Sequence, residues 1–167
     1  MNTHWNTIIW SQFGAAIDML ENAVVACPEE LWGDRSEPQQ FWYVTFHCLF
    51  WLDFYLSGSE DGFAPPAPFT LDEFDPAGIL PERVYAKQEL LDYLDYGRKK
   101  CQTTIAGMSD EQARQIYRFG WGEVSFSELL LYNMRHVQEH AAQLSLLLGQ
   151  KYGFDPRWVA KAKSKPS

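Results

Sequence analysis

The chain has 167 residues, 46% of them hydrophobic, which predicts one compact domain over residues 1–167 with a substantial core. Its 14 Lys and Arg against 22 Asp and Glu give a formal net charge of -8, which disfavours nucleic acid and anionic membranes as partners. Its three scattered cysteines form no CxxC pair, which argues against a disulfide framework and favours a reducing, cytoplasmic setting.

The N-terminal residues and the most apolar segment give no sign of export or membrane insertion. The first five residues lack the basic stretch and the apolar run of a secretory signal. The most apolar run, residues 41–56, contains His47 and Asp53 and is shorter than the roughly 18 apolar residues of a membrane span. We therefore expect a buried helix there and no membrane partner.

The first half of the chain predicts two long helices. Residues 5–26 contain no proline and carry apolar residues at helical spacing. Residues 28–32 predict a short extra turn, with proline first and acids near the positive end of the helix dipole. The second long helix is predicted to start at residues 36–39, with Ser36 as cap and Pro38 in the first turn, and to end near Ser57.

The second half predicts a long connection and two further helices. Residues 58–80 are rich in Pro, Gly and Asp, and a connection of this length often carries function, so we expect it to lie across one end of the bundle. A third helix is predicted from Pro81 to Ala106, a short capped helix at residues 109–112 and extended or turning chain at 117–122. A capping box at residues 125–128 begins the fourth helix, which runs to about Gln150. No segment shows convincing strand alternation, so the predicted fold is an all-α four-helix bundle with short extra helices.

The fourth helix carries two histidines on its apolar face. Advancing 100° per residue from His136 places His140 at about 40°, and Leu129 and Leu147 at about 20°. A lone buried histidine is usually a core residue with one hydrogen bond. Two imidazoles at positions i and i+4, however, reach one metal ion at about 2.0–2.1 Å without distorting the helix.

His47 supplies a third imidazole from the middle of the second helix. Three of the four histidines thus lie at mid-helix positions on inward faces, and only His4 lies at a terminus. The alternative is that His47 only hydrogen-bonds a tyrosine across the core, which would leave several buried nitrogens without partners. We therefore predict that His47, His136 and His140 bind one divalent ion and leave positions open for water or substrate.

Other residues near this site are candidates for weaker roles. Five residues are candidates to hydrogen-bond the predicted metal-binding histidines from behind. They are Tyr43, Tyr132, Asn133, Glu139 and Gln143, of which Glu139 is the weakest candidate. Cys48 points about 100° away from His47 and is expected to pack in the core rather than bind metal. Aromatic residues surround the second helix on every side, which favours a homodimer formed through one of its faces.

The sequence resembles the DinB-like (YfiT-type) superfamily of bacterial four-helix bundles. The resemblance is carried by FHCL at residues 46–49, NMRHVQEHAAQL at residues 133–144 and PEELW at residues 28–32. It implies an up-up-down-down bundle, often dimeric, with a three-histidine site for zinc, nickel or a related ion at His47, His136 and His140. It further implies a small-molecule substrate, because characterised relatives include transferases and isomerases that use low-molecular-weight thiols. The family name does not imply DNA repair by this acidic chain.

Three functions follow from these observations. The first is a thiol-dependent S-transferase that uses a divalent ion, Zn²⁺ or Ni²⁺ in the first place and Fe²⁺ or Mn²⁺ as alternatives. The second is a metal-dependent hydrolase, for which the same open positions serve. The third is a non-catalytic bundle that binds metal or a protein partner. No fourth protein ligand is evident in the sequence, which favours catalysis over a structural ion.

Overall fold

The protein is described by a computed structural model over residues 3–36, 39–154 and 157–163. Its elements in chain order are α1 (Thr3–Ala26), α2 (Glu29–Trp32), α3 (Phe41–Ser57), the 3-10 turn η1 (Asp72–Phe74), α4 (Lys87–Gly107), α5 (Asp110–Arg114), β1 (Ile116–Phe119), β2 (Gly122–Ser125) and α6 (Phe126–Tyr152). The all-α bundle with short extra helices is confirmed.

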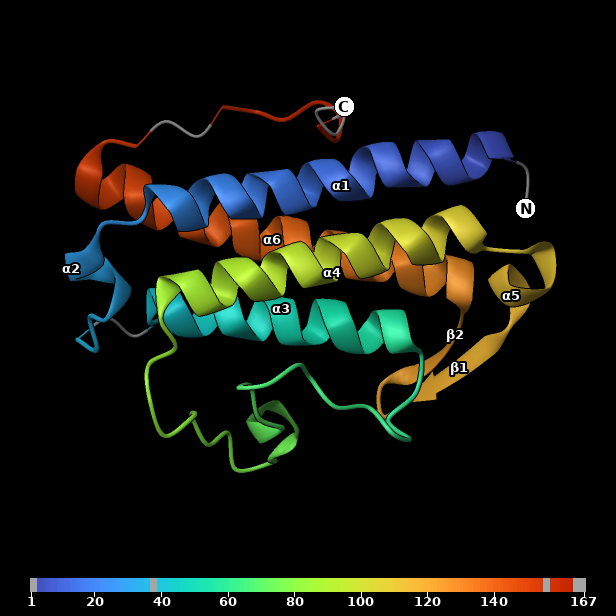
Figure 1. The fold of residues 1–167 in the computed structure, drawn as a ribbon, viewed down its shortest axis with the longest axis horizontal. Helices are drawn as coiled ribbons and strands as arrows, with labels where there is room; N and C mark the ends of the chain where they lie inside the picture. Colours follow the sequence, from blue (N-terminus) through green and yellow to red (C-terminus); the bar gives the residue numbers. More distant parts are fainter. Residues whose placement is uncertain (1–2, 37–38, 155–156, 164–167) are drawn as a thin grey trace.

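The four long helices form a ring in which α1 and α3 lie on opposite corners. Each of them packs against both α4 and α6. Figure 1 shows α1 and α6 running in one direction and α3 and α4 in the other. The order is therefore up-down-down-up, which replaces the up-up-down-down order. The short link through α2 reverses the chain after α1, whereas the long crossover makes α3 and α4 parallel.

Buried carboxylates as well as apolar side chains tie the helices together. Asp53 of α3 accepts hydrogen bonds from Lys100 Nζ at 2.5 Å and from the Tyr93 hydroxyl at 3.0 Å, and both donors lie on α4. Asp18 of α1 is fully buried and pairs with Arg98 of α4. These ion pairs join α1 and α3 to α4. Among the described residues, no ion pair joins α3 to α6.

Two of the predicted helix starts are confirmed and two are moved. Ser125 and Ser109 accept hydrogen bonds from the backbone of Glu128 and Gln112, as the capping patterns predict. The second long helix begins at Phe41 rather than at residues 36–39. Ser36 does not cap this helix, because its hydroxyl bonds the carboxylate of Asp34. Pro38, which was predicted in the first turn, lies outside the described residues.

The third long helix begins at Lys87 rather than Pro81. Residues 81–86 lie outside the helix, and two of their backbone groups are bonded elsewhere: the Tyr85 carbonyl accepts from Trp32 Nε1 at 2.9 Å, and the Ala86 backbone donates to Glu89 at 2.7 Å. The connection therefore runs from residue 58 to residue 86. A helix over these residues would lose the bond between Tyr85 and α2.

A small β-hairpin stands where no strand was predicted. Strands β1 and β2 pair antiparallel, with Ile116 opposite Ser125 and Phe119 opposite Gly122. Each strand has only four residues and both are largely exposed, so neither carries an alternating apolar pattern long enough to be recognised. The expectation of extended or turning chain at residues 117–122 is correct, and the hairpin leads directly into α6.

The long connection lies along the outer side of α3, not across an end of the bundle (Figure 1). It must travel back along the bundle because α3 and α4 are parallel. Its Phe63, Phe69 and Phe74 pack against the aromatic rings of Phe46, Phe50 and Phe54 on α3. The three Phe residues of α3 are fully buried, and full burial of such a side chain contributes about 1.5–3 kcal/mol, whereas those of the connection are partly buried and contribute less. The chain thus covers by itself the aromatic face on which the predicted homodimer rested.

Among the described residues, no helix is long and apolar enough to cross a membrane. The most apolar helix, α3, ends after 17 residues at Gly58, whose φ of 74° is the left-handed conformation typical of a glycine that terminates a helix. This agrees with the expectation of a buried helix at residues 41–56.

Candidate metal centre

The three predicted histidines meet at the contact between α3 and α6. His136 Nε2 lies 3.4 Å from His47 Nε2 and 3.0 Å from His140 Nε2. One nitrogen from each of the three rings falls within 4.8 Å of the others. The helix spacing brings His136 and His140 together, and the antiparallel packing of α3 on α6 adds His47.

The spacing of these nitrogens fits a shared metal ion. Two nitrogens bound at about 2.0–2.1 Å, at angles between a right angle and a tetrahedral one, lie about 2.8–3.4 Å apart. Two of the three separations, 3.0 and 3.4 Å, fall in this range, and the third is no more than 4.8 Å. The residues present therefore match a divalent ion in the number, kind and spacing of their donor atoms.

The proton positions on the rings point to the same conclusion. His47 Nδ1 lies 2.6 Å from the Glu73 carboxylate and His140 Nδ1 lies 2.8 Å from Gln143 Oε1. Both oxygens only accept hydrogen bonds, so both Nδ1 atoms carry a proton, and in the neutral rings the two Nε2 atoms present lone pairs. A single proton on His136 Nε2 can satisfy one of these lone pairs but not both. A bound cation would satisfy all three nitrogens.

The surroundings keep His136 and His140 neutral, as metal-binding imidazoles must be. Burial, reinforced by the nearby His140 and His47, lowers the pKa of His136 to about 3. Burial also lowers the pKa of His140, against the opposing effect of its hydrogen bond with Gln143. Near neutral pH both rings therefore offer lone pairs rather than positive charge.

Glu73 is the functional residue that the sequence did not reveal. Its carboxylate bonds His47 Nδ1 at 2.6 Å and Trp51 Nε1 at 2.8 Å, and its side chain is only 4% exposed. Burial tends to raise the pKa of Glu73, but the interactions with His47, Trp51 and Tyr43 outweigh it and lower that pKa. A carboxylate behind a metal-binding histidine fixes the ring and makes it a stronger ligand.

Of the residues predicted to support the histidines, some lie at the site and others lie elsewhere. Gln143 holds His140, and the Tyr43 ring lies 6.3 Å from that of His47. Asn133 is fully buried and instead donates to the Leu52 carbonyl at 3.0 Å, which joins α6 to α3. Glu139 is exposed and lines a different groove, between α1 and α6.

The sulfur atoms of the chain take no part in the cluster. Cys48 is fully buried beside His47 in the sequence, and burial raises the pKa of its thiol. Burial raises the pKa of Cys27 and Cys101 in the same way. The three thiols are therefore inert at neutral pH, and the packing role predicted for Cys48 agrees with this.

An aromatic wall, formed by Tyr55, Trp121 and Tyr132, stands on one side of the histidines. The Tyr55 ring lies 6.4 Å from that of His136 and 5.2 Å from that of Tyr132. Trp121, at the hairpin turn, stacks on Tyr132 at 4.7 Å with 16° between the planes, and it is 48% exposed. The unpredicted hairpin thus contributes one residue to the surroundings of the site.

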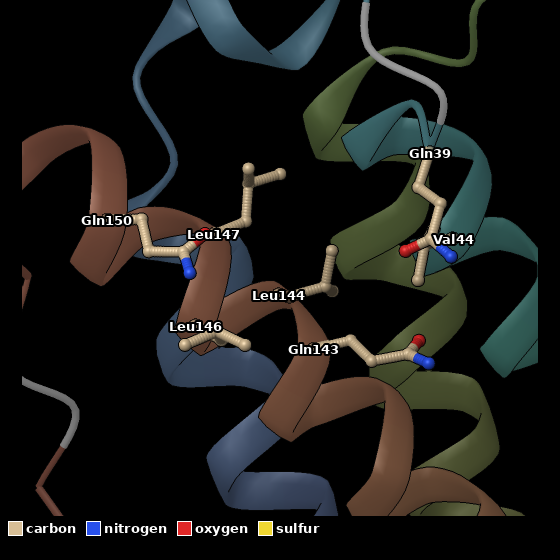
Figure 2. Close-up of a pocket in the computed structure, with 7 residues that line it drawn as sticks. All are labelled: Gln39, Val44, Gln143, Leu144, Leu146, Leu147 and Gln150. Atoms are coloured by element: carbon tan, nitrogen blue, oxygen red, sulfur yellow. The ribbon is translucent and has the colours of Figure 1, made fainter.

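A pocket lies on the other side, between the start of α3 and the end of α6 (Figure 2). It has a volume of about 260 Å³ and is lined by Gln39, Gln143 and Gln150 with four aliphatic side chains. We call it the glutamine pocket. One of its aliphatic residues, Val44, precedes His47 by three positions, and Gln143 follows His140 by three, so the pocket is about one helical turn from the histidines.

Comparison with known proteins supports this placement. No curated protein and no solved structure matches the chain. The family model of the DinB superfamily matches residues 12–144, a span that includes all three histidines and well over half of the chain. The chain therefore belongs to the DinB superfamily.

Proposed function

We propose that this protein is a metal-dependent enzyme that joins a low-molecular-weight thiol to an electrophilic small molecule. The observation that carries the proposal is the convergence of three imidazole nitrogens, two of them fixed as lone pairs by Glu73 and Gln143. Among the described residues, no fourth His, Cys, Asp or Glu joins this group. Three protein ligands with an open position are typical of catalytic rather than structural ions.

A divalent ion held there would act as a Lewis acid that favours the deprotonated form of a thiol or of water near neutral pH. The chain's own residues prepare the site for this. Glu73 and Gln143 hold the rings of His47 and His140, and burial keeps His136 neutral. The His47 side chain is 32% exposed, which gives a small molecule access from solvent.

In the proposed thiol transfer the nucleophile is a substrate, because the protein supplies no reactive sulfur of its own. All three cysteines are buried with raised thiol pKa values, so a sulfur nucleophile must come from a substrate. A hydrolase would use the same open position for water. The aromatic wall beside His136 offers a surface for a planar or apolar electrophile.

The first test is the metal content of protein purified without a nickel column. We expect close to one equivalent of a divalent transition metal per chain, and loss of this metal in His136→Ala but not in His4→Ala, which changes the one histidine outside the cluster. Less than about one-tenth equivalent, with no rise in thermal stability on adding Zn²⁺ or Ni²⁺, would contradict the proposal.

The second test separates transfer from hydrolysis. Loaded protein is incubated with a panel of electrophiles in the presence and absence of low-molecular-weight thiols, and the products are identified by mass spectrometry. We expect thiol adducts that require both the metal and His136. Turnover that is independent of thiol would assign the protein as a hydrolase, and no turnover at all would favour a binding role.

A further inference from the structure

The chemistry of the glutamine pocket differs from that of the rest of the site. Its polar lining consists of three carboxamides, and among the described residues no ionisable side chain lines it. Val44, Leu144, Leu146 and Leu147 supply the apolar remainder. Figure 2 shows Gln39 and Val44 on one side of this space and the residues of α6 on the other. The pocket therefore suits a group that is uncharged but forms several hydrogen bonds.

The hydrogen-bonding capacity of the pocket is largely unused. Gln143 Oε1 is bonded by His140 Nδ1, which leaves the amide nitrogen of Gln143 to face other partners. The carboxamides of Gln39 and Gln150 make no hydrogen bond to another side chain or backbone group in the described part of the chain. Each carboxamide offers a donor and an acceptor, as hydroxyls and amides require.

Gln143 connects this pocket to the metal centre. Its oxygen holds the His140 ring at 2.8 Å, so a single imidazole ring separates the pocket lining from the nitrogen that faces the ion. The volume of about 260 Å³ lies just below the range of about 300–1,000 Å³ of sites that enclose a drug-sized ligand. The pocket therefore fits one end of a small molecule whose other end reaches the ion.

We propose that the glutamine pocket binds the uncharged, hydroxyl- or amide-bearing end of the thiol substrate, an inference that rests on the proposed thiol chemistry. A sugar-like or amide-like arm places its polar groups against the three carboxamides and its carbon atoms against the leucines. A charged arm is disfavoured, because among the described lining residues it finds no counter-ion. The pocket thus selects among thiols by the group distant from the sulfur.

The test measures thiol binding directly, without turnover. The protein is loaded with Co²⁺, and each thiol is followed by the absorption that a sulfur ligand adds to the cobalt spectrum. The probes are 2-mercaptoethanol as a short reference, 1-thio-β-D-glucose with a hydroxyl arm, N-acetylcysteamine with an amide arm and 3-mercaptopropionate with a carboxylate arm. Affinities are compared per concentration of thiolate, so that differences in thiol pKa do not enter.

We expect the hydroxyl or the amide probe to bind at least about fivefold more tightly than 2-mercaptoethanol, and the carboxylate probe to show no gain. The double variant Gln39→Leu/Gln150→Leu should remove this gain while leaving the affinity for 2-mercaptoethanol unchanged. Both glutamines are exposed and neither contacts a histidine, so folding and metal content should be preserved. Gln115→Leu, an exposed glutamine next to β1 at the other end of the bundle, is the matched control.

The outcomes separate the two levels of the proposal. Equal affinity for all four thiols, or a gain that survives in the double variant, overturns the pocket assignment and leaves the thiol chemistry standing. No sulfur absorption with any thiol on the cobalt-loaded protein overturns the thiol chemistry and the pocket assignment with it. A gain confined to the hydroxyl probe or to the amide probe identifies which of the two arms the pocket accepts.

Discussion

The two contacts that α3 makes, with α4 and with α6, use buried polar groups in opposite ways. Toward α4, Asp53 is matched by a cation and a hydroxyl from Lys100 and Tyr93. Toward α6, the nitrogens of His47, His136 and His140 face one another without enough protons to pair them. The paired groups around Asp53 hold α3 and α4 together. The converging nitrogen lone pairs between α3 and α6, in contrast, indicate a binding site for a cation.

The largest effect is expected when one of the α6 histidines is removed, which tests whether the contact between α3 and α6 is a binding site. His136→Ala should lower the affinity for Zn²⁺ by more than the about 10–100-fold expected for an outer contact, because it deletes a ligand. Without metal the variant should be as stable as the unaltered protein, since the removed ring has a buried Nδ1 without a partner. Competition with a chelator gives the affinity, and thermal unfolding in EDTA gives the stability. A large loss of stability in EDTA would show that the histidines are structural.

The matching change on the α4 side is Asp53→Ala. It should lower the free energy of unfolding by on the order of 3 kcal/mol, the lower end for breaking a buried pair, because Lys100 lies near the surface and can turn toward solvent. Urea unfolding measures this loss. Zinc affinity should stay within about twofold of the unaltered protein. A parallel loss of metal binding would mean that the two contacts of α3 are not independent.

A smaller effect is expected when the carboxylate behind His47 is neutralised. Glu73→Gln keeps the shape of the side chain but weakens the bond to His47 Nδ1, so zinc affinity should fall by about 10–100-fold while the ion still binds. The neighbouring Asp72→Asn is the control, because Asp72 bonds Thr70 and not a histidine. If the zinc affinity of Glu73→Gln is unchanged, Glu73 only holds the connection against α3 and does not support metal binding.

The residues around the histidine cluster also show how much of the site could be predicted from the sequence. His136 and His140 share a helix, and regular helical spacing places their side chains on one face without knowledge of the rest of the fold. Gln143 follows by the same periodicity. Glu73 lies in an irregular connection with no periodicity, so only the three-dimensional path of residues 58–86 could bring it to His47. The sequence predicted that this connection carries function but not which residue does so.

The shape of the fold was likewise predictable only in part. The helices follow from apolar periodicity and capping residues, and Ser109 and Ser125 cap as expected. The hairpin did not, because its strands of four residues are too short and too exposed to show a pattern. The start of α4 was misplaced because Tyr85 and Ala86 bond to groups outside the local sequence. In each case tertiary contacts decided the structure.

The smallest predicted effect concerns the start of the ligand-bearing helix. Ser125→Ala removes the hydroxyl that accepts the Glu128 backbone N–H, which should cost about 1 kcal/mol of stability. The histidines lie more than two turns along α6 from this cap, so zinc affinity should not change. Ser109→Ala, at the cap of α5, should cost a similar amount. Urea titrations with and without zinc are sufficient to compare them.

The distance along the chain between the ligands has a consequence for when the ion can arrive. His47 and His136 are separated by 89 residues, and His136 and His140 both lie on α6, the last of the described helices. During synthesis, His47 is therefore made well before His136 and His140. The three nitrogens can meet only after α6 has packed against α3. At the proposed three-histidine site an ion can be captured tightly only by the finished bundle, so we expect metal binding to follow folding rather than to start it.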